Sequence, residues 1–292
     1  MWTKIIEFIL TKIAVRNFEI GNSQIAIDLF EKLSGSEKKS NFVYLGLAYY
    51  MEGNYYKAYR NFKLCVGMGT AESKNAYGWI VHLDLENFEK VDLYELPQMN
   101  IHFMEKFAKR EKYSFIQKNL EAYEYINSNI NVKFKKKIDV FVYRSNNDNI
   151  GNRLSFANPP LLTIHTQFKH TKGHELAHLF VNNIYEGVNS KNRFIDEGFA
   201  EYFNEQQIYD ETKIHDVLEG ANVNIYCYWN NFEQYSPDFS YQVAGCFVGF
   251  FIYKMGIEKS QLLMRNQEYK AARKVYRKQL DDIISQFESL TK

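Results

Sequence analysis

Two histidines and a glutamate form the pattern H-E-x-x-H at residues 174–178 of this 292-residue chain. On a helix, this spacing places the imidazoles of His174 and His178 on one face, one turn apart. Such a pair suits zinc, which binds nitrogen and oxygen donors at about 2 Å in a tetrahedron. A catalytic zinc also needs a third protein ligand and one open position for water. Glu197 lies 19 positions beyond His178 and is a candidate for that ligand.

The segment around Glu197 gives the chain a family resemblance. Eighteen residues separate His178 from Glu197, which stands in the sequence Asp196-Glu197-Gly198-Phe199-Ala200. H-E-x-x-H with Glu at this spacing resembles the gluzincin metallopeptidases, most closely the alanyl-aminopeptidase family and its shorter peptidase MA-like relatives. The resemblance runs from about Asn100 to the C-terminus. It implies a zinc metallopeptidase in which His174, His178 and Glu197 bind Zn²⁺.

Two further carboxylates receive roles on this interpretation. Glu175 is expected to act as the general base, which takes the proton of the attacking water and passes it to the leaving amine. Glu201 lies at i+4 from Glu197, on the same helical face. As in related gluzincins, it is expected to accept the second ring N–H of a ligand histidine; a surface ion pair is the alternative. His165 and His170 are interpreted as ordinary strand or surface histidines.

A tyrosine is the expected donor to the oxyanion of the tetrahedral intermediate. In the resembled aminopeptidases it stands at the start of a downstream apolar helix, and here Tyr241 is expected to open a helix over 241–255. Tyr241 is therefore the candidate. The chain has 22 tyrosines, so a core or rim position is the alternative for Tyr241. Tyr202 and Tyr235 are rival donors.

One departure from the aminopeptidases concerns specificity. Those enzymes carry Gly-x-Met-Glu-Asn shortly before the zinc helix, and its Glu binds the free amino terminus of the substrate. The corresponding stretch here, Ser155–Pro160, contains no Glu. We therefore expect an endopeptidase or a peptidase with a narrow protein substrate. The alternatives are an aminopeptidase that uses other residues, and an interaction protein whose zinc domain binds peptides without cleaving them. The intact Glu175 argues against the last.

The elements that position these residues are expected to form an α+β, thermolysin-like zincin domain over 96–292. A helix over 171–183 carries both histidines, and a helix over 195–209 carries Glu197. In the resembled family, a strand at the place of 161–165 is an edge strand that pairs with the substrate backbone. Sequence periodicity and turn residues predict the remaining elements: strands at 101–104 and 138–143, helices at 112–127, 257–265 and 271–290, and an irregular rim at 221–240.

Residues 1–95 are expected to form a separate all-α domain. The spacing of Phe42, Leu45-Gly46, Tyr49, Ala58 and Phe62 resembles one tetratricopeptide repeat. Helices over 3–16 and 23–33 are expected to form a degenerate copy, with a helix over 71–85 as a cap. The first helix should bury an apolar stripe made of Ile5, Ile6, Ile9, Leu10 and Ile13. Such repeats usually bind a peptide or a partner protein; a lid or spacer packed on the enzyme is the alternative.

Composition bounds the setting. A formal net charge of +1 gives no field that would attract nucleic acid or an anionic membrane. The three cysteines form no disulfide framework, and the N-terminus is interpreted as a helix rather than a signal peptide. We therefore expect a cytoplasmic protein with a peptide or protein substrate, and neither a nucleic-acid nor a membrane partner.

Overall fold

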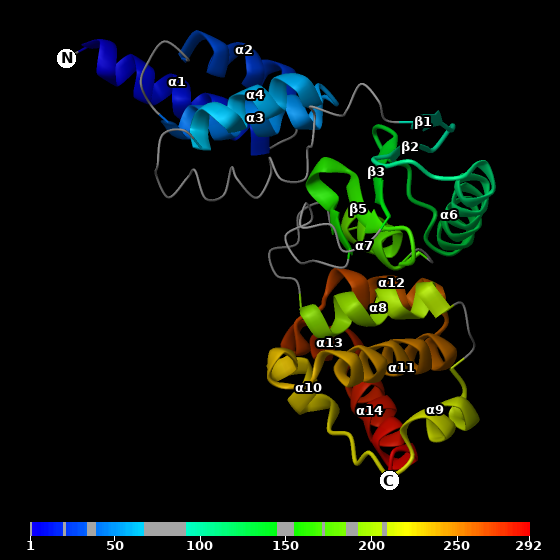
Figure 1. The fold of residues 1–292 in the computed structure, drawn as a ribbon. Coiled ribbons are helices and arrows are strands. Elements are labelled where there is room, and N and C mark those ends of the chain that lie inside the picture. Colours follow the sequence, from blue (N-terminus) through cyan, green and yellow to red (C-terminus); the bar gives the residue numbers. More distant parts are fainter. Residues whose placement is uncertain are drawn as a thin grey trace.

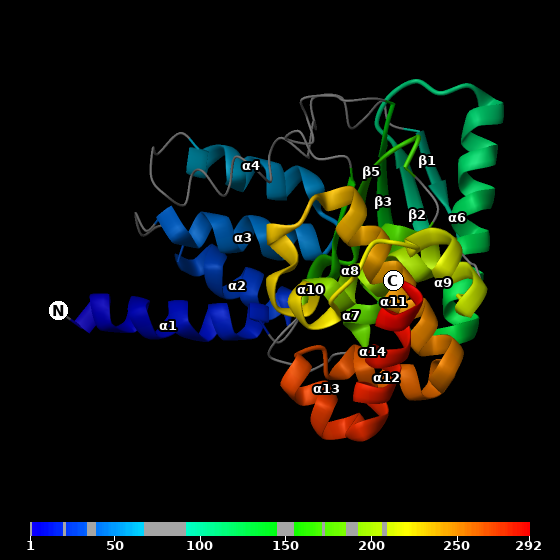
Figure 2. The same ribbon diagram turned by 90° about the horizontal axis from the view of Figure 1, so that it is seen from below.

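The computed structural model describes residues 2–19, 22–33, 39–66, 92–144, 155–170, 173–184, 192–205 and 209–292. Over these residues the fold is mixed α+β, as predicted, with one five-stranded sheet. The sheet lies between a group of N-terminal helices and the long helix α6 (Lys109–Ile130), as both views show (Figures 1 and 2). The described part contains no helix that is both long enough and apolar enough to cross a membrane.

The N-terminal helices are α1 (Trp2–Glu19), α2 (Ser23–Leu33), α3 (Lys39–Met51) and α4 (Tyr55–Val66). In the pair α3–α4, a Cβ atom at Gly46 would lie 2.5 Å from the Phe62 ring. The missing side chain thus lets the two helices approach and lets Phe62 fill the space between them. That the pair is a tetratricopeptide repeat stays a prediction, and the predicted helix over 71–85 lies outside the described residues.

The apolar stripe predicted to be buried on the first helix is mostly exposed. Four of its side chains are between 43% and 54% exposed: Ile5, Ile6, Ile9 and Ile13. The side of α1 that packs against its neighbours is instead centred on Ala14, with Leu10 and Phe18 partly buried. The prediction was wrong because α1 is apolar around most of its circumference, so that the spacing of apolar residues does not single out one face.

The sheet has the strand order β1-β2-β3-β5-β4. The parallel strands β2 (Met99–Phe103), β3 (Ile138–Tyr143) and β5 (Thr163–Gln167) form its centre. The edge strands β1 (Asp92–Glu95) and β4 (Ser155–Asn158) pair antiparallel. The strands predicted at 101–104 and 138–143 are confirmed. Because β1 pairs with β2, the sheet begins before residue 96, where the second domain was predicted to start; the two-domain division itself stays a prediction.

The strand predicted at 161–165 begins later than expected and is not at the edge of the sheet. Pro159–Leu161 form a short 3₁₀ turn, η3, and β5 begins only at Thr163. Prolines cannot donate a hydrogen bond to a sheet ladder, so the chain turns at Pro159 and Pro160 before it extends. β5 is also an interior strand, since β3 and β4 pair with its two sides. The edge strand at this end of the sheet is therefore β4.

Different helices cover the two faces of the sheet. Along β3, Val140 and Val142 belong to the core shared with α6 and α7 (His174–Asn183), whereas Phe141 and Tyr143 pack with the N-terminal helices. This alternation follows from the period of two in a strand. The N-terminal helices thus cover the face of the sheet opposite to α7, the helix that carries the two histidines.

Buried polar contacts join the N-terminal helices to the sheet. His165 of β5 is fully buried, with its Nε2 2.8 Å from the hydroxyl of Tyr50 and its Nδ1 3.0 Å from the hydroxyl of Tyr143. Its ring stacks between Phe141 and Phe156. His165 is therefore a strand histidine of the core and His170 is exposed, as predicted for both.

Helices make up the rest of the described chain: α8 (Arg193–Glu205), α9 (Glu211–Leu218), α10 (Ile225–Asn231), α11 (Pro237–Met255), α12 (Ile257–Arg265), α13 (Tyr269–Tyr276) and α14 (Lys278–Leu290). The predicted irregular rim at 221–240 is largely helical, because the buried Trp229 packs against Phe194 and Phe247. The predicted helix over 271–290 is two helices. Arg277 has a φ of 53°, a left-handed conformation that interrupts a right-handed helix.

Candidate metal centre

A glycine allows α7 to begin against α6. Gly173, just before His174, has a φ of 110°, which residues with a side chain rarely adopt. A Cβ atom there would also lie 3.2 Å from the Cβ of Ala122 in α6. The first turn of α7 is thereby fixed against α6, and this turn carries His174 and Glu175. The helix therefore begins at His174 rather than at residue 171, where it was predicted to start.

Two more glycines set the close crossing of α8 and α11. A Cβ atom on Gly198 would lie 2.6 Å from the carbonyl oxygen of Ala244, and one on Gly245 would lie 2.8 Å from the Cβ of Glu201. Since neither glycine has a side chain, the two helices pack backbone to backbone. The crossing brings the residue before Gly198, which is Glu197, next to the helical turn before Gly245.

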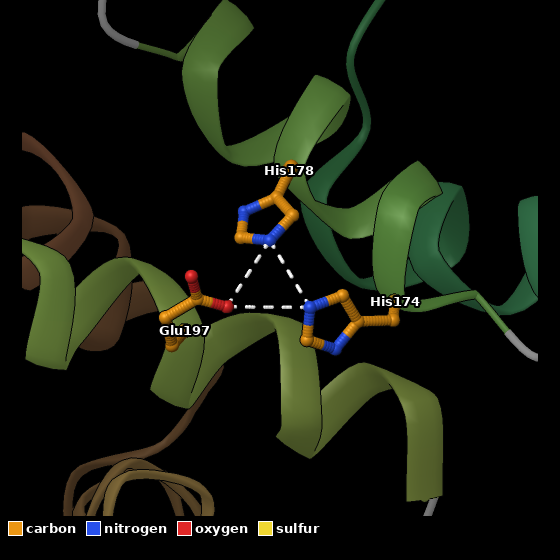
Figure 3. A group of neighbouring side chains, drawn as sticks. All are labelled: His174, His178 and Glu197. Atoms are coloured by element: carbon orange, nitrogen blue, oxygen red, sulfur yellow. Dashed lines mark hydrogen bonds and ion pairs between the residues drawn. The ribbon is translucent and has the colours of Figure 1, made fainter. Parts of the chain in front are cut away.

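The three predicted ligands meet at one point (Figure 3). His174 Nε2 and His178 Nε2 lie 3.3 Å and 3.4 Å from Glu197 Oε2, and the two nitrogens lie 3.2 Å apart. Donors placed about 2.0–2.1 Å from a tetrahedral zinc ion are about 3.3 Å from one another. The three separations in this chain therefore match those of a zinc ligand set.

The outer nitrogen of each imidazole faces a carboxylate. His174 Nδ1 lies 3.0 Å from Glu201 Oε1, and His178 Nδ1 lies 3.1 Å from Asp196 Oδ2. A carboxylate accepts hydrogen bonds, so in each neutral ring Nδ1 carries the hydrogen and Nε2 keeps its lone pair. Glu197 Oε2 is buried and then has no hydrogen-bond donor among the described residues. Three acceptor atoms thus converge, which fits a divalent cation such as Zn²⁺.

The charges of the centre depend on protons as well as on a metal. Burial lowers the pKa of His174, but hydrogen bonds to Glu197 and Glu201 outweigh burial and raise it to about 9. The pKa of His178 is likewise held well above its usual value by Asp196 and Glu197, against the effect of burial. Burial would raise the pKa of Glu197, yet both histidines hold it far below its usual range. Protons and a metal therefore compete for the same atoms.

Asp196 is a site residue that the sequence analysis did not identify. In the structure, the Asp196 carboxylate faces Nδ1 of His178 as the Glu201 carboxylate faces Nδ1 of His174. The sequence could have indicated this residue, because each of two ligand histidines needs an acceptor for its second ring N–H and only Glu201 had been assigned as one.

The structure places Tyr241 at the centre. Its hydroxyl donates to Glu197 Oε1 at 3.1 Å, and its ring lies 6.2 Å from the ring of His174. It stands in the second turn of α11 rather than at the start predicted for the helix. The helix begins at Pro237, a residue type that favours the first helical position.

Arg193 is a second residue that sequence reasoning missed. Its Nη2 donates to the Tyr241 hydroxyl at 3.1 Å, and its Nε lies 3.5 Å from Glu197 Oε1. An ion pair with Glu233 holds the other arm of the guanidinium. Arg193 stands at i−4 from Glu197, so helical spacing was the signal that could have found it.

The rival tyrosines lie elsewhere. Tyr202 packs edge-on against Phe203, and Tyr235 stacks on Tyr228 with ring centroids 3.9 Å apart. Neither Tyr202 nor Tyr235 lines the cleft beside the ligands, which Tyr241 does.

Glu175 faces a cleft of about 880 Å³ that His174, Glu201 and Tyr241 also line. Burial raises the pKa of the Glu175 carboxyl, against the effects of the two histidines and of a hydrogen bond from the backbone N–H of Ala157. Ala157 belongs to β4. Since this N–H bonds to Glu175 rather than to β5, the edge of β4 opposite to β5 faces Glu175.

No protein-family model matches this chain, and none of the curated proteins matches it. The resemblance to the gluzincins therefore depends on the motif residues alone.

Proposed function

We propose that this chain is a zinc-dependent peptidase of the gluzincin type. The convergence of His174 Nε2, His178 Nε2 and Glu197 Oε2 at separations that suit one zinc ion carries the proposal. The presence of Glu175 in the adjoining cleft supports hydrolysis rather than binding alone. Bound zinc would polarise the scissile carbonyl and bring the pKa of a water in its open position toward about 7.

Glu175 is the general base in this proposal. Its carboxylate takes a proton from the attacking water and later passes it to the departing amine. The backbone N–H of Ala157 fixes the carboxylate from the β4 side. Burial raises the pKa of Glu175, which brings it closer to neutrality, where one group both accepts and returns a proton efficiently.

Tyr241 is the donor to the oxyanion. Its hydroxyl hydrogen bonds to Glu197 Oε1 at 3.1 Å and would turn toward the substrate oxygen as negative charge develops there. Arg193 donates to the oxygen of the same hydroxyl at 3.1 Å. That bond holds the phenol in place while its O–H rotates toward the substrate, and it makes the hydroxyl a better hydrogen-bond donor to the oxyanion.

The edge of β4 opposite to β5 is the proposed place for the substrate backbone. An extended peptide would add a strand beside Ser155–Asn158, next to Glu175. The absence of a glutamate from this strand supports an endopeptidase or a narrow-specificity peptidase over an aminopeptidase.

We propose a thermolysin-like zincin domain for the sheet with α7 and α8, and a cytoplasmic protein without a nucleic-acid or membrane partner. The N-terminal helices are proposed as tetratricopeptide-like. Since they cover the face of the sheet away from α7, a role as spacer or partner site fits better than a lid over the cleft.

Cleavage of a quenched fluorescent peptide library tests the function. The zinc-loaded wild type should cleave peptides, including N-terminally blocked ones, and Glu175→Gln should lose cleavage while it retains zinc. Glu124→Gln, an exposed glutamate of α6, is the matched control and should stay active. Cleavage only of peptides with a free amino terminus would point to an aminopeptidase. Full activity in Glu175→Gln would overturn the mechanism.

A further inference from the structure

Among the residues that the structure describes, one lysine in the wall of the cleft has no counter-ion. Lys213, in the first turn of α9, lines the cleft and is half-buried. No described carboxylate forms an ion pair or hydrogen bond with its ammonium group, and this includes the exposed Asp216, three positions further along the same helix. Glu211 pairs with Lys254, and the Asp210 side chain accepts from the backbone N–H of Lys213 to cap α9.

The protein behind Lys213 does not supply the missing charge. Its ammonium lies close enough to Cys246 to act on the thiol electrostatically. Burial nevertheless raises the pKa of Cys246 to about 12, so the thiol is neutral at physiological pH. Lys213 therefore reaches the cleft without a charged partner among the described residues.

The cleft lining also contains a second lysine and three carboxylates. Lys169 and His170, which follow β5, also line the cleft and are exposed; within the described residues, Lys169 has no ion pair. Among the acids of the lining, Glu201 is bound to His174 and Glu175 stands at the point of attack. Asp238 lies in the first turn of α11, where the helix dipole favours a negative charge.

We propose that Lys213, with Lys169 in the same cleft, binds a carboxylate of the peptide substrate. This proposal rests on the proposed peptidase function and specifies its substrates as peptides that carry a carboxylate near the scissile bond. The carboxylate has two possible sources: the side chain of an aspartate or glutamate near the scissile bond, or the free α-carboxylate at the end of a short peptide. Each would restore the counter-charge that Lys213 lacks.

Peptide binding to zinc-loaded full-length Glu175→Gln tests the subsite without turnover. Fluorescence anisotropy would compare four labelled peptides of one sequence: neutral and amidated, with one glutamate, with one lysine, and with a free C-terminus. Peptides that present the matching carboxylate should bind about 10-fold or more tightly than the neutral one, the range of a charge-assisted hydrogen bond. A gain confined to the glutamate peptide assigns a side-chain subsite, and a gain confined to the free C-terminus assigns an α-carboxylate subsite.

Two changes at Lys213 separate recognition from general charge. Adding Lys213→Gln should abolish the preference, and Lys213→Glu should reverse it toward the lysine peptide. Lys270→Gln, which removes an exposed lysine on α13, should leave it intact. Equal binding of neutral and carboxylate peptides, or a preference that survives Lys213→Gln, would overturn the subsite.

Cleavage assays on the wild type distinguish an error in the proposed subsite from an error in the proposed peptidase function. Cleavage of neutral and acidic peptides at equal rates would overturn the subsite and leave the peptidase standing. Carboxylate-selective binding without any cleavage by the wild type would overturn the peptidase and leave a carboxylate-binding cleft.

Discussion

Replacing Asp196 by alanine should weaken zinc binding although Asp196 is not a ligand. The substitution removes the acceptor that lies 3.1 Å from His178 Nδ1. The His178 side chain is only 13% exposed, so water replaces that acceptor poorly. The ring is then free to rotate or to move its hydrogen to Nε2, the atom that must stay bare for a metal.

The size of the effect follows from the role of the carboxylate. Loss of such an outer partner typically lowers metal affinity about 10–100-fold, or about 1.4–2.7 kcal/mol. Asp196 is nearly as buried as His178, which favours the upper part of this range for Asp196→Ala. Asp196→Asn keeps an acceptor oxygen and loses only the charge, so we expect about a 10-fold loss or less.

The assay is competition for zinc with a chromophoric chelator at fixed pH. Zinc affinity should fall in the order wild type, Asp196→Asn, Asp196→Ala, and Glu201→Ala should resemble Asp196→Ala because Glu201 orients the other ligand, His174. Asp282→Ala, an exposed aspartate of α14, is the control. Equal zinc affinity in the wild type and in Asp196→Ala would refute the reasoning.

Three more predictions address the rest of the account. Tyr241→Phe should lower kcat about 10²–10³-fold with zinc retained, and adding Arg193→Ala should cost little more, because Arg193 acts through Tyr241; additive losses would contradict this. Since the pKa of His174 is raised to about 9, the metal-free site holds protons below that pH. Zinc affinity should therefore fall as pH falls, with proton release measurable by calorimetry in buffers of different ionisation enthalpy; an affinity independent of pH would contradict the proton competition. Tyr50→Phe should lower the free energy of unfolding in urea by about 1–3 kcal/mol, because it removes the hydroxyl that lies 2.8 Å from buried His165 Nε2, and zinc affinity should not change; an unchanged unfolding free energy would contradict the buried contact.

The sequence predicted best the residues tied to one another by helical spacing. His174 and His178 are one turn apart, and Glu197 and Glu201 are one turn apart, so each pair meets once its helix forms. Glycines at 173, 198 and 245 then set how closely the helices approach. Their role depends on which helix crosses which, and that is a property of the tertiary structure rather than of local spacing.

The sequence did not predict features that depend on tertiary packing, such as which face of a helix is buried or where a strand lies in the sheet. The first helix is apolar on most sides, and only its packing on α2 and α3 decides that Ala14 is buried and Ile9 exposed. The strand predicted at 161–165 was identified, but its place in the interior depends on pairing with β4. Arg193 and Tyr241 are 48 positions apart, and their hydrogen bond forms because α8 and α11 cross.

Metal content tests the central claim most directly. Purified full-length wild type, Glu197→Ala and Glu175→Gln would each be supplied with zinc, freed of excess metal and analysed by mass spectrometry. The account predicts about one zinc per chain in the wild type and in Glu175→Gln, and loss of zinc in Glu197→Ala. A wild-type chain that binds no metal, or Glu197→Ala that binds as much as the wild type, would contradict it.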